Sequence, residues 1–160
     1  MNVQVDVQQA ADDESIPDTA FVSDWVTRAV NAATITRDSE VSVRIVGADE
    51  IHALNHEYRQ KDAPTNVLSF PAGAVAGLPN DAPQPLGDIV ICASVVRDEA
   101  EAQGKTLADH WAHMLVHGTL HLLGFDHQTD VEAAAMETLE RRILSAHGIA
   151  DPYGVTVENC

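Results

Sequence analysis

The sequence predicts a single α+β domain over residues 1–160, with a small, mostly parallel or mixed four-stranded sheet and about five helices. Three observations lead to this prediction. β-branched residues alternate in short runs, apolar residues recur elsewhere at helical spacing, and the C-terminal half is almost entirely helical in pattern. The element order βαβα, then ββ, then ααα is typical of a small sheet covered by helices.

The first half of the chain contains two pairs of strand and helix. Residues 3–7 and 41–46 alternate between β-branched and polar residues, so each is expected to form a half-buried strand. Apolar residues recur at helical spacing over 21–30, and Asp18 before them provides a plausible helix start. A second helix is expected over 49–59.

Two further strands and three helices are expected in the second half. Residues 66–70 and 88–92 read as strands, and the Gly-, Pro- and Ala-rich segment 72–86 between them predicts a mobile surface loop. A helix over 93–103 ends before Gly104. Thr106 and Thr129, each followed three residues later by an acidic residue, predict the starts of the last two helices, which end near Gly124 and Gly148.

Composition and charge narrow the possible partners. The chain has 9 Lys and Arg against 25 Asp and Glu, a formal net charge of −16. Such a charge repels nucleic acids and anionic membranes, so any RNA must bind at a local positive site, and no DNA partner is expected. No run approaches the ~18 apolar residues of a membrane span, and residues 1–6 do not read as a signal peptide. We therefore expect a cytoplasmic protein whose two cysteines, Cys92 and Cys160, are free thiols.

Three histidines in residues 117–127, at spacing H-x3-H-x5-H, form the candidate metal site. On a helix, His117 and His121 lie about 40° apart around the axis and about 6 Å apart along it, so both can bind one ion. Gly124 can end the helix and let the chain return, bringing His127 back as a third ligand. Three imidazoles with one open position are typical of a catalytic zinc site, although other divalent transition metals also suit imidazole.

The spacing also occurs in zinc peptidases, which leaves other functions open. In H-E-x-x-H peptidases the residue after the first histidine is a glutamate that acts as general base, and here that residue is Gly118. A zinc peptidase or amidase would therefore need a carboxylate from elsewhere in the chain. A third possibility is a non-catalytic ribosome-assembly factor whose metal is structural, which a fourth protein ligand would indicate.

The run 117–127, with residues 110–113 just before it and a second block at 58–71 and 86–89, resembles the YbeY family. Its members are bacterial metal-dependent endoribonucleases of rRNA maturation. The resemblance implies zinc-dependent hydrolysis of RNA phosphodiester bonds in 16S rRNA 3′-end maturation and ribosome quality control. It also implies His117, His121 and His127 as ligands of one Zn²⁺ and Arg59 as an essential basic residue. This chain departs from the pattern at Asn66, where the family more often has Asp.

Arg59 also suits the reaction on physical grounds. Phosphodiester cleavage adds negative charge to the phosphate, and a guanidinium can donate to two phosphate oxygens at once. We therefore expect Arg59 and His117 to be catalytic, the latter through the metal. The acidic net charge suggests that rRNA is presented within ribosomal particles, or by a ribosomal or assembly-factor protein partner.

The neighbouring polar residues admit two interpretations each. His113 lies one turn before His117 and could support a ligand or be an ordinary core histidine. Asp126 could orient a ligand imidazole or cap its own turn. Thr65 and Ser69 could contact phosphate, although turn and strand roles explain them equally well.

Overall fold

The structure is a computed structural model, and it describes residues 2–33, 37–73, 77, 79, 82–126 and 128–153. Its sheet has four strands in the order β1-β2-β4-β3. These are β1 (Val3–Gln9), β2 (Ser39–Val46), β4 (Gln84–Cys92) and β3 (Val67–Pro71). The first three are parallel, and β3 runs antiparallel to β4 at the edge. The expected α+β class and mixed, mostly parallel sheet are confirmed.

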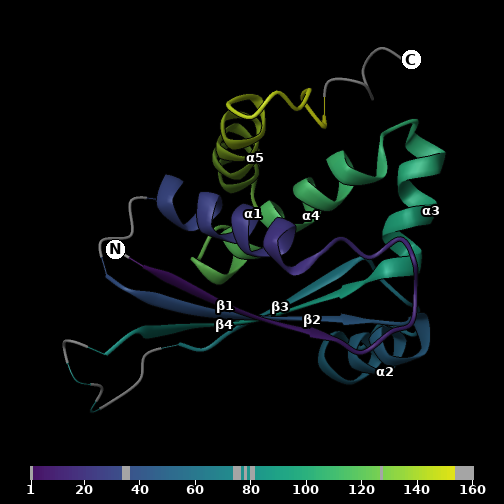
Figure 1. The fold of residues 1–160 in the computed structure, drawn as a ribbon, viewed down its shortest axis with the longest axis horizontal. Coiled ribbons are helices and arrows are strands. Elements are labelled where there is room, and N and C mark those ends of the chain that lie inside the picture. Colours follow the sequence, from purple (N-terminus) through teal and green to yellow (C-terminus); the bar gives the residue numbers. More distant parts are fainter. Residues whose placement is uncertain are drawn as a thin grey trace.

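Five helices cover this sheet, as expected (Figure 1). One face carries α1 (Thr19–Ala32), α4 (Leu107–Leu122) and α5 (Asp130–Ser145), and α2 (Ala48–Arg59) lies on the opposite side. The remaining helix, α3 (Ala93–Gln103), follows β4 directly and packs beside α4. Two of the three candidate ligands, His117 and His121, are therefore carried by a helix that lies between the sheet and another helix.

Burial follows this two-sided arrangement. The larger core lies between the sheet and α1, α4 and α5, and includes fully buried Ile89, Trp111 and Leu115. A smaller cluster between the sheet and α2 contains Ile51 and Leu68. Because successive residues of a strand point to opposite faces, β3 places Leu68 on the α2 side and Ser69 on the α4 side.

The helix starts inferred from capping residues are confirmed. The Asp18 carboxylate accepts from the backbone N–H of Phe21, and the Thr106 and Thr129 hydroxyls accept from the residues three further on. Each bond satisfies one of the backbone N–H groups left free in a first helical turn. Gly104, with φ 67°, ends α3 in the left-handed conformation.

The predicted loop over 72–86 is wrong at its C-terminal end, because β4 already begins at Gln84. Residues 84–87 pair with β2 across an irregular register at Glu40 and Val41. Pro85 and Gly87 give this stretch the composition of a loop, yet β2 and β3 flank it on both sides. Gly87 has φ 137°, and a Cβ there would collide with the carbonyl oxygen of Phe70. The glycine thus permits the pairing of β3 with β4.

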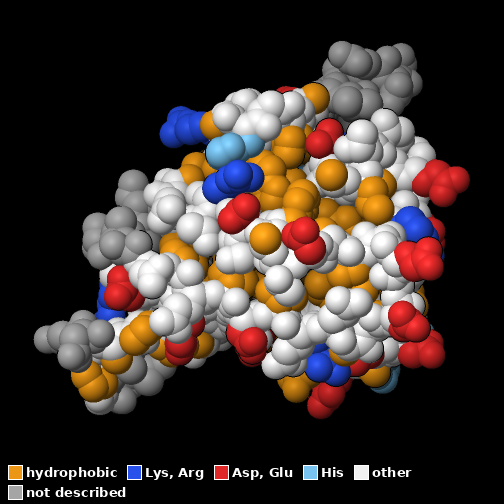
Figure 2. All heavy atoms as spheres, in the orientation of Figure 1, with side chains coloured by type: hydrophobic (Ala, Val, Ile, Leu, Met, Phe, Trp, Pro, Cys, Tyr) orange, Lys and Arg blue, Asp and Glu red, His pale blue; other side chains and the backbone are white. Residues whose placement is uncertain are grey.

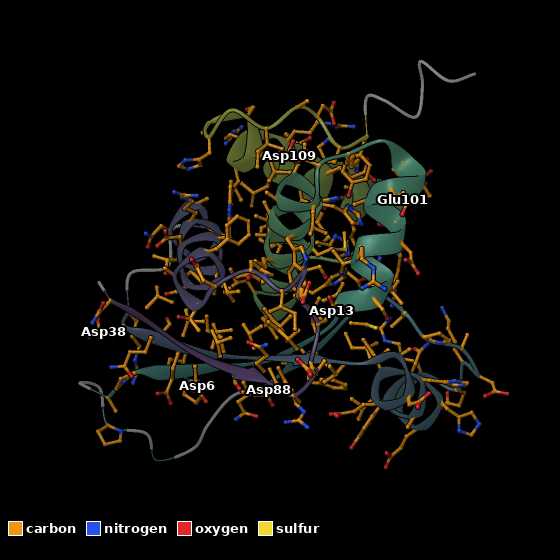
Figure 3. All side chains as sticks on the ribbon, turned by 45° about the vertical axis from the view of Figure 1, so that its right-hand side comes forward. Asp6, Asp13, Asp38, Asp88, Glu101 and Asp109 are labelled. Carbon is orange, nitrogen blue, oxygen red and sulfur yellow. The ribbon has the colours of Figure 1, made fainter. Side chains whose placement is uncertain are left out.

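Acidic side chains are spread over the whole molecule. On the face in Figure 2 they outnumber the basic side chains, most densely along the right-hand edge. Figure 3 labels acidic residues from several elements, among them Asp6 on β1 and Asp88 on β4, which the register places on either side of Ser42. With Glu40 these two line an open groove of about 670 Å³ on the sheet. That groove is electrostatically unfavourable for RNA.

In the described part of the chain, no helix is long and apolar enough to cross a membrane. Cys92 is buried at the end of β4 as a free thiol, and Cys160 lies outside the described residues.

Candidate functional site

His117 and His121 lie on one face of α4 with their imidazoles directed at each other. Their Nε2 atoms are 3.2 Å apart and their ring centroids 4.7 Å apart. Two nitrogen ligands at 2.0–2.1 Å from one tetrahedral zinc ion lie roughly 3.3 Å apart, since the angle between them is near 109°. The observed separation of the two nitrogens therefore fits shared binding of one ion.

Close packing of α4 on the sheet places these histidines above β3. A Cβ on Gly118 would lie 3.1 Å from a methyl group of Ile89 and 3.2 Å from one of Val67. The Ser69 hydroxyl donates to the backbone carbonyl of Gly118 at 2.9 Å. The residue after His117 thus faces the sheet, so the glutamate of an H-E-x-x-H peptidase would not fit at this position without moving the helix.

Arg59 approaches the two histidines from α2, on the other side of the sheet. It is the last residue of α2, and Gln60 after it takes the left-handed conformation with φ 55°. The buried amide of Asn55 donates to the carbonyl of Ala63 at 2.8 Å, which holds the turn that follows. Arg59, His117 and His121 then line one cavity of about 150 Å³. The other lining residues are Thr65, Asn66, Val67 and Ser69.

A buried hydrogen-bond network lies behind His117, centred on Glu140 of α5. Glu140 is fully buried and its carboxylate is 2.6 Å from His113 Nε2 and 3.3 Å from His117 Nδ1. The Tyr153 hydroxyl donates to both carboxylate oxygens, at 2.9 and 3.1 Å. His117 is therefore bracketed, with Nδ1 facing a carboxylate and Nε2 facing His121.

The pKa shifts of this network agree with its geometry. Burial raises the pKa of Glu140, but its hydrogen bonds and charge interactions with His113 and His117 outweigh this effect and lower it to about 2. Burial is also the main cause that lowers the pKa of His113. Burial, followed by the nearby Glu140 charge, raises the pKa of Tyr153 far above its usual value. At neutral pH Glu140 is therefore an anion, and the Tyr153 hydroxyl that donates to it keeps its proton.

A second histidine–carboxylate pair lies beside the cavity. His110 is buried, and its Nε2 lies 2.9 Å from Glu99 on α3. The Asn66 amide donates to both oxygens of the same carboxylate, at 3.1 and 3.3 Å. An aspartate at position 66 could not make these contacts as an anion, because it has no proton to donate.

Two further residues predicted from the sequence, Asp126 and His127, follow the end of α4 in the chain. His127 lies outside the described residues. Asp126 is half-buried just beyond the end of α4. The structure thus brings together His117, His121 and Arg59 of the expected site, while the place of His127 stays a prediction.

Comparison with known proteins identifies the family. The family model described as "Endoribonuclease YbeY" matches residues 5–148. The chain belongs to the YbeY endoribonuclease family. A Halorhodospira halophila protein named endoribonuclease YbeY is 55% identical over 139 residues, which cover 87% of this chain and 89% of that protein. A Xanthomonas campestris pv. campestris protein of the same name is 49% identical over 154 residues, covering 96% and 94%.

A solved structure supports the fold. The solution structure of TM1509 from Thermotoga maritima matches with a TM-score of 0.54 over 94% of this chain and 98% of that one, at 22% identity. The family resemblance drawn from the histidine run and the 58–71 block is confirmed by these comparisons.

The sequence runs that carried the family resemblance do not include two residues that matter in this network, Glu140 and Tyr153. A signal for Glu140 was present in the sequence: it lies four residues after Met136 and three before Ile143, on the apolar face of α5. A carboxylate on a buried helix face needs partners, so its position alone pointed to a polar network. Tyr153 gave no such signal, because it follows α5 and its role depends on tertiary contacts.

Three residues of the Glu140 network also have the ligand types and the spacing that a metal ion needs. His113, His117 and Glu140 offer ligand atoms that all lie within 4.8 Å of one another. However, the Glu140 carboxylate already accepts from Tyr153 and is closed off from solvent. A catalytic metal needs an open position, which the cavity beside His121 offers.

Proposed function

We propose that this chain is a metal-dependent endoribonuclease in which His117, His121 and His127 bind one zinc ion and Arg59 binds the scissile phosphate. The supporting observation is the pair of Nε2 atoms 3.2 Å apart in a cavity that Arg59 also lines. The close relatives named endoribonuclease support the same reaction class. His127 is included as the third ligand because of its spacing in the sequence and the family resemblance.

The chain's own residues account for substrate binding and charge stabilisation. Arg59 is exposed at the end of α2, with Lys61 exposed two residues later. Arg59 thus provides positive charge at the cavity, in a molecule whose net charge repels phosphate. The guanidinium can donate to two phosphate oxygens as negative charge develops there. A bound metal would supply a Lewis acid for the scissile phosphate or an activated water.

We propose ribosomal RNA as the substrate, including the 3′ end of 16S rRNA, presented within a ribosomal particle. The acidic surface and the small cavity both argue against tight binding of free RNA. A large particle or a protein partner would offset this repulsion with contacts of its own.

The test is cleavage of a 16S rRNA fragment spanning the mature 3′ end by purified protein loaded with one equivalent of zinc. We expect cutting that a chelator stops and added zinc restores, and that is absent in His117→Ala. His56→Ala is the matched control, because this exposed α2 histidine is not among the cavity-lining residues. Cutting that survives chelation and His117→Ala would contradict the proposal. A peptide library incubated with the same preparation tests the peptidase alternative, and no hydrolysis is expected.

A further inference from the structure

The Glu140 carboxylate contacts both His113 and His117. It is fully buried on α5, and α5 packs directly on α4. Burying an anion in a protein core is costly unless several donors satisfy it. Here three donors converge on its two oxygens, from Tyr153, His113 and His117.

Tyr153 is itself held in place by several contacts. Its backbone N–H donates to Asp151 at 2.8 Å, and Asp151 accepts from the Arg141 guanidinium at 3.0 Å. Arg141 also lies over the Tyr153 ring, 5.3 Å from the ring centre. Because Arg141 directly follows Glu140 on α5, this helix fixes both the carboxylate and the tyrosine that donates to it.

We infer that Glu140, anchored by Tyr153, is a positioning residue that orients His117 so that its Nε2 faces His121 and the cavity. This inference rests on the proposed function only in taking His117 and His121 as metal ligands. When Nδ1–H donates to the carboxylate, the proton of neutral His117 is on Nδ1, and Nε2 carries the lone pair that a metal needs. The 3.3 Å contact thus selects the tautomer as well as the ring orientation.

The alternative is that Glu140 is a ligand itself, in the group with His113 and His117. The two possibilities differ in what His113 does. If His113, His117 and Glu140 bind the metal, replacing His113 removes one of its nitrogen ligands. Under our inference His113 only donates to Glu140, and a glutamine can still do so.

The experiment measures zinc affinity of the full chain by competition with a chelator, and the visible spectrum of the cobalt(II)-loaded protein. Glu140→Gln should weaken zinc binding by roughly 10–100-fold, the usual effect of losing a partner behind a metal-binding histidine. Tyr153→Phe should weaken it less, because Glu140 keeps its histidine partners. Glu137→Gln is the matched control, since this glutamate lies one turn before Glu140 on α5, pairs with Arg141 at 3.7 Å and should leave the affinity unchanged.

Each outcome bears on the inference. A His113→Gln protein that keeps most of its zinc affinity, together with an unaltered cobalt spectrum in Glu140→Gln, supports the positioning role. Loss of zinc in His113→Gln as complete as in His117→Ala, with a changed cobalt spectrum in Glu140→Gln, would make Glu140 a ligand and overturn it. Unchanged affinity in Glu140→Gln would also overturn it.

Thermal unfolding of the metal-free variants separates positioning from stability. If Glu140→Gln lowers the melting temperature but not the affinity of the folded protein, the role of Glu140 is structural only and the inference fails. If Glu140→Gln does not fold, Tyr153→Phe decides, and wild-type affinity in that variant counts against the inference. Metal binding is measured without RNA, so a chain that binds zinc normally but does not cut RNA contradicts the proposed function alone.

Discussion

The two halves of the candidate site are built in opposite ways. The histidine half is carried by α4, between the sheet and α5, and the Nδ1 of His117 is backed by a buried carboxylate. The arginine half is the exposed last residue of α2, and a left-handed turn follows it. The histidine half is held by the packing of α4 against the sheet and α5, whereas Arg59 is exposed.

Because of this difference, substitutions in the two halves should affect different properties of the protein. Changes in the histidine half should alter metal binding and stability together, since the same contacts serve both. Changes in Arg59 should alter catalysis alone, because exposed side chains contribute little to folding. Substitutions that separate these effects test the comparison directly.

Loss of a ligand histidine should have the largest effect. In His121→Ala one of the two Nε2 atoms that lie 3.2 Å apart is gone, so we expect no bound zinc and no detectable cleavage. Elemental analysis of untagged protein and a cleavage assay measure the two quantities, with His56→Ala as the control. A full equivalent of zinc in His121→Ala would show that the metal lies elsewhere.

Arg59→Ala should have the next largest effect, and on rate only. Removal of one preorganised donor to a developing charge costs ~10²–10³ in rate. Zinc content and the free energy of unfolding should match those of the parent, because the Arg59 side chain is exposed. Cleavage is followed under single-turnover conditions, and Lys61→Ala, with a smaller loss expected, is the comparison. Normal cleavage by Arg59→Ala would show that Arg59 does not take part in the reaction.

Much of the histidine half could be predicted from the sequence, because its signals are local. The capping residues Thr106 and Thr129 gave the starts of α4 and α5, and the four-residue spacing placed His117 and His121 on one face. The sequence also shows Gly118 where an H-E-x-x-H peptidase has its general base. Its packing against β3 and β4 could not be inferred, since that contact joins segments far apart in the chain.

The missed features all depend on tertiary contacts. Residues 84–86 were expected to be loop because the segment 72–86 is rich in glycine, proline and alanine, yet they belong to β4, which pairs with β2. Tyr153 joins Glu140 and His113 across 13 and 40 residues, respectively. Arg59 was placed near the histidines by family resemblance alone, since nothing local to α2 indicates which surface its end approaches.

A methyl group added at the contact between α4 and the sheet should have a smaller effect. Gly118→Ala places a Cβ 3.1 Å from Ile89 and 3.2 Å from Val67, so α4 must shift outward slightly. Overpacking costs ~1–3 kcal/mol, and alanine recovers roughly 1 kcal/mol of helix propensity, so we expect a net loss near ~1 kcal/mol. Denaturant unfolding measures it, with Gly47→Ala, where no atom lies within 4 Å, as the control. A more stable Gly118→Ala protein would mean that the packing is looser than described.

The smallest effect is expected at Glu99, which links the cavity residue Asn66 to buried His110. Burial raises the pKa of Glu99, but hydrogen bonds from His110 and Asn66 lower it, and the net direction is down. A carboxylate with a lowered folded-state pKa stabilises the protein above its unfolded pKa, ~4.3, and loses this contribution as pH falls through the folded value.

Glu99→Gln should therefore reduce stability at pH 7 by roughly 1 kcal/mol or less, and the gap to the parent should close as the pH falls below ~4. Urea unfolding at pH 7, 5 and 3 measures this, with exposed Glu101→Gln on the same helix as the control. A gap that stays constant down to pH 3 would show that the Glu99 charge contributes nothing. The position of Asn66 at the cavity would then depend on the packing of His110 and Asn66, and not on the carboxylate that both residues contact.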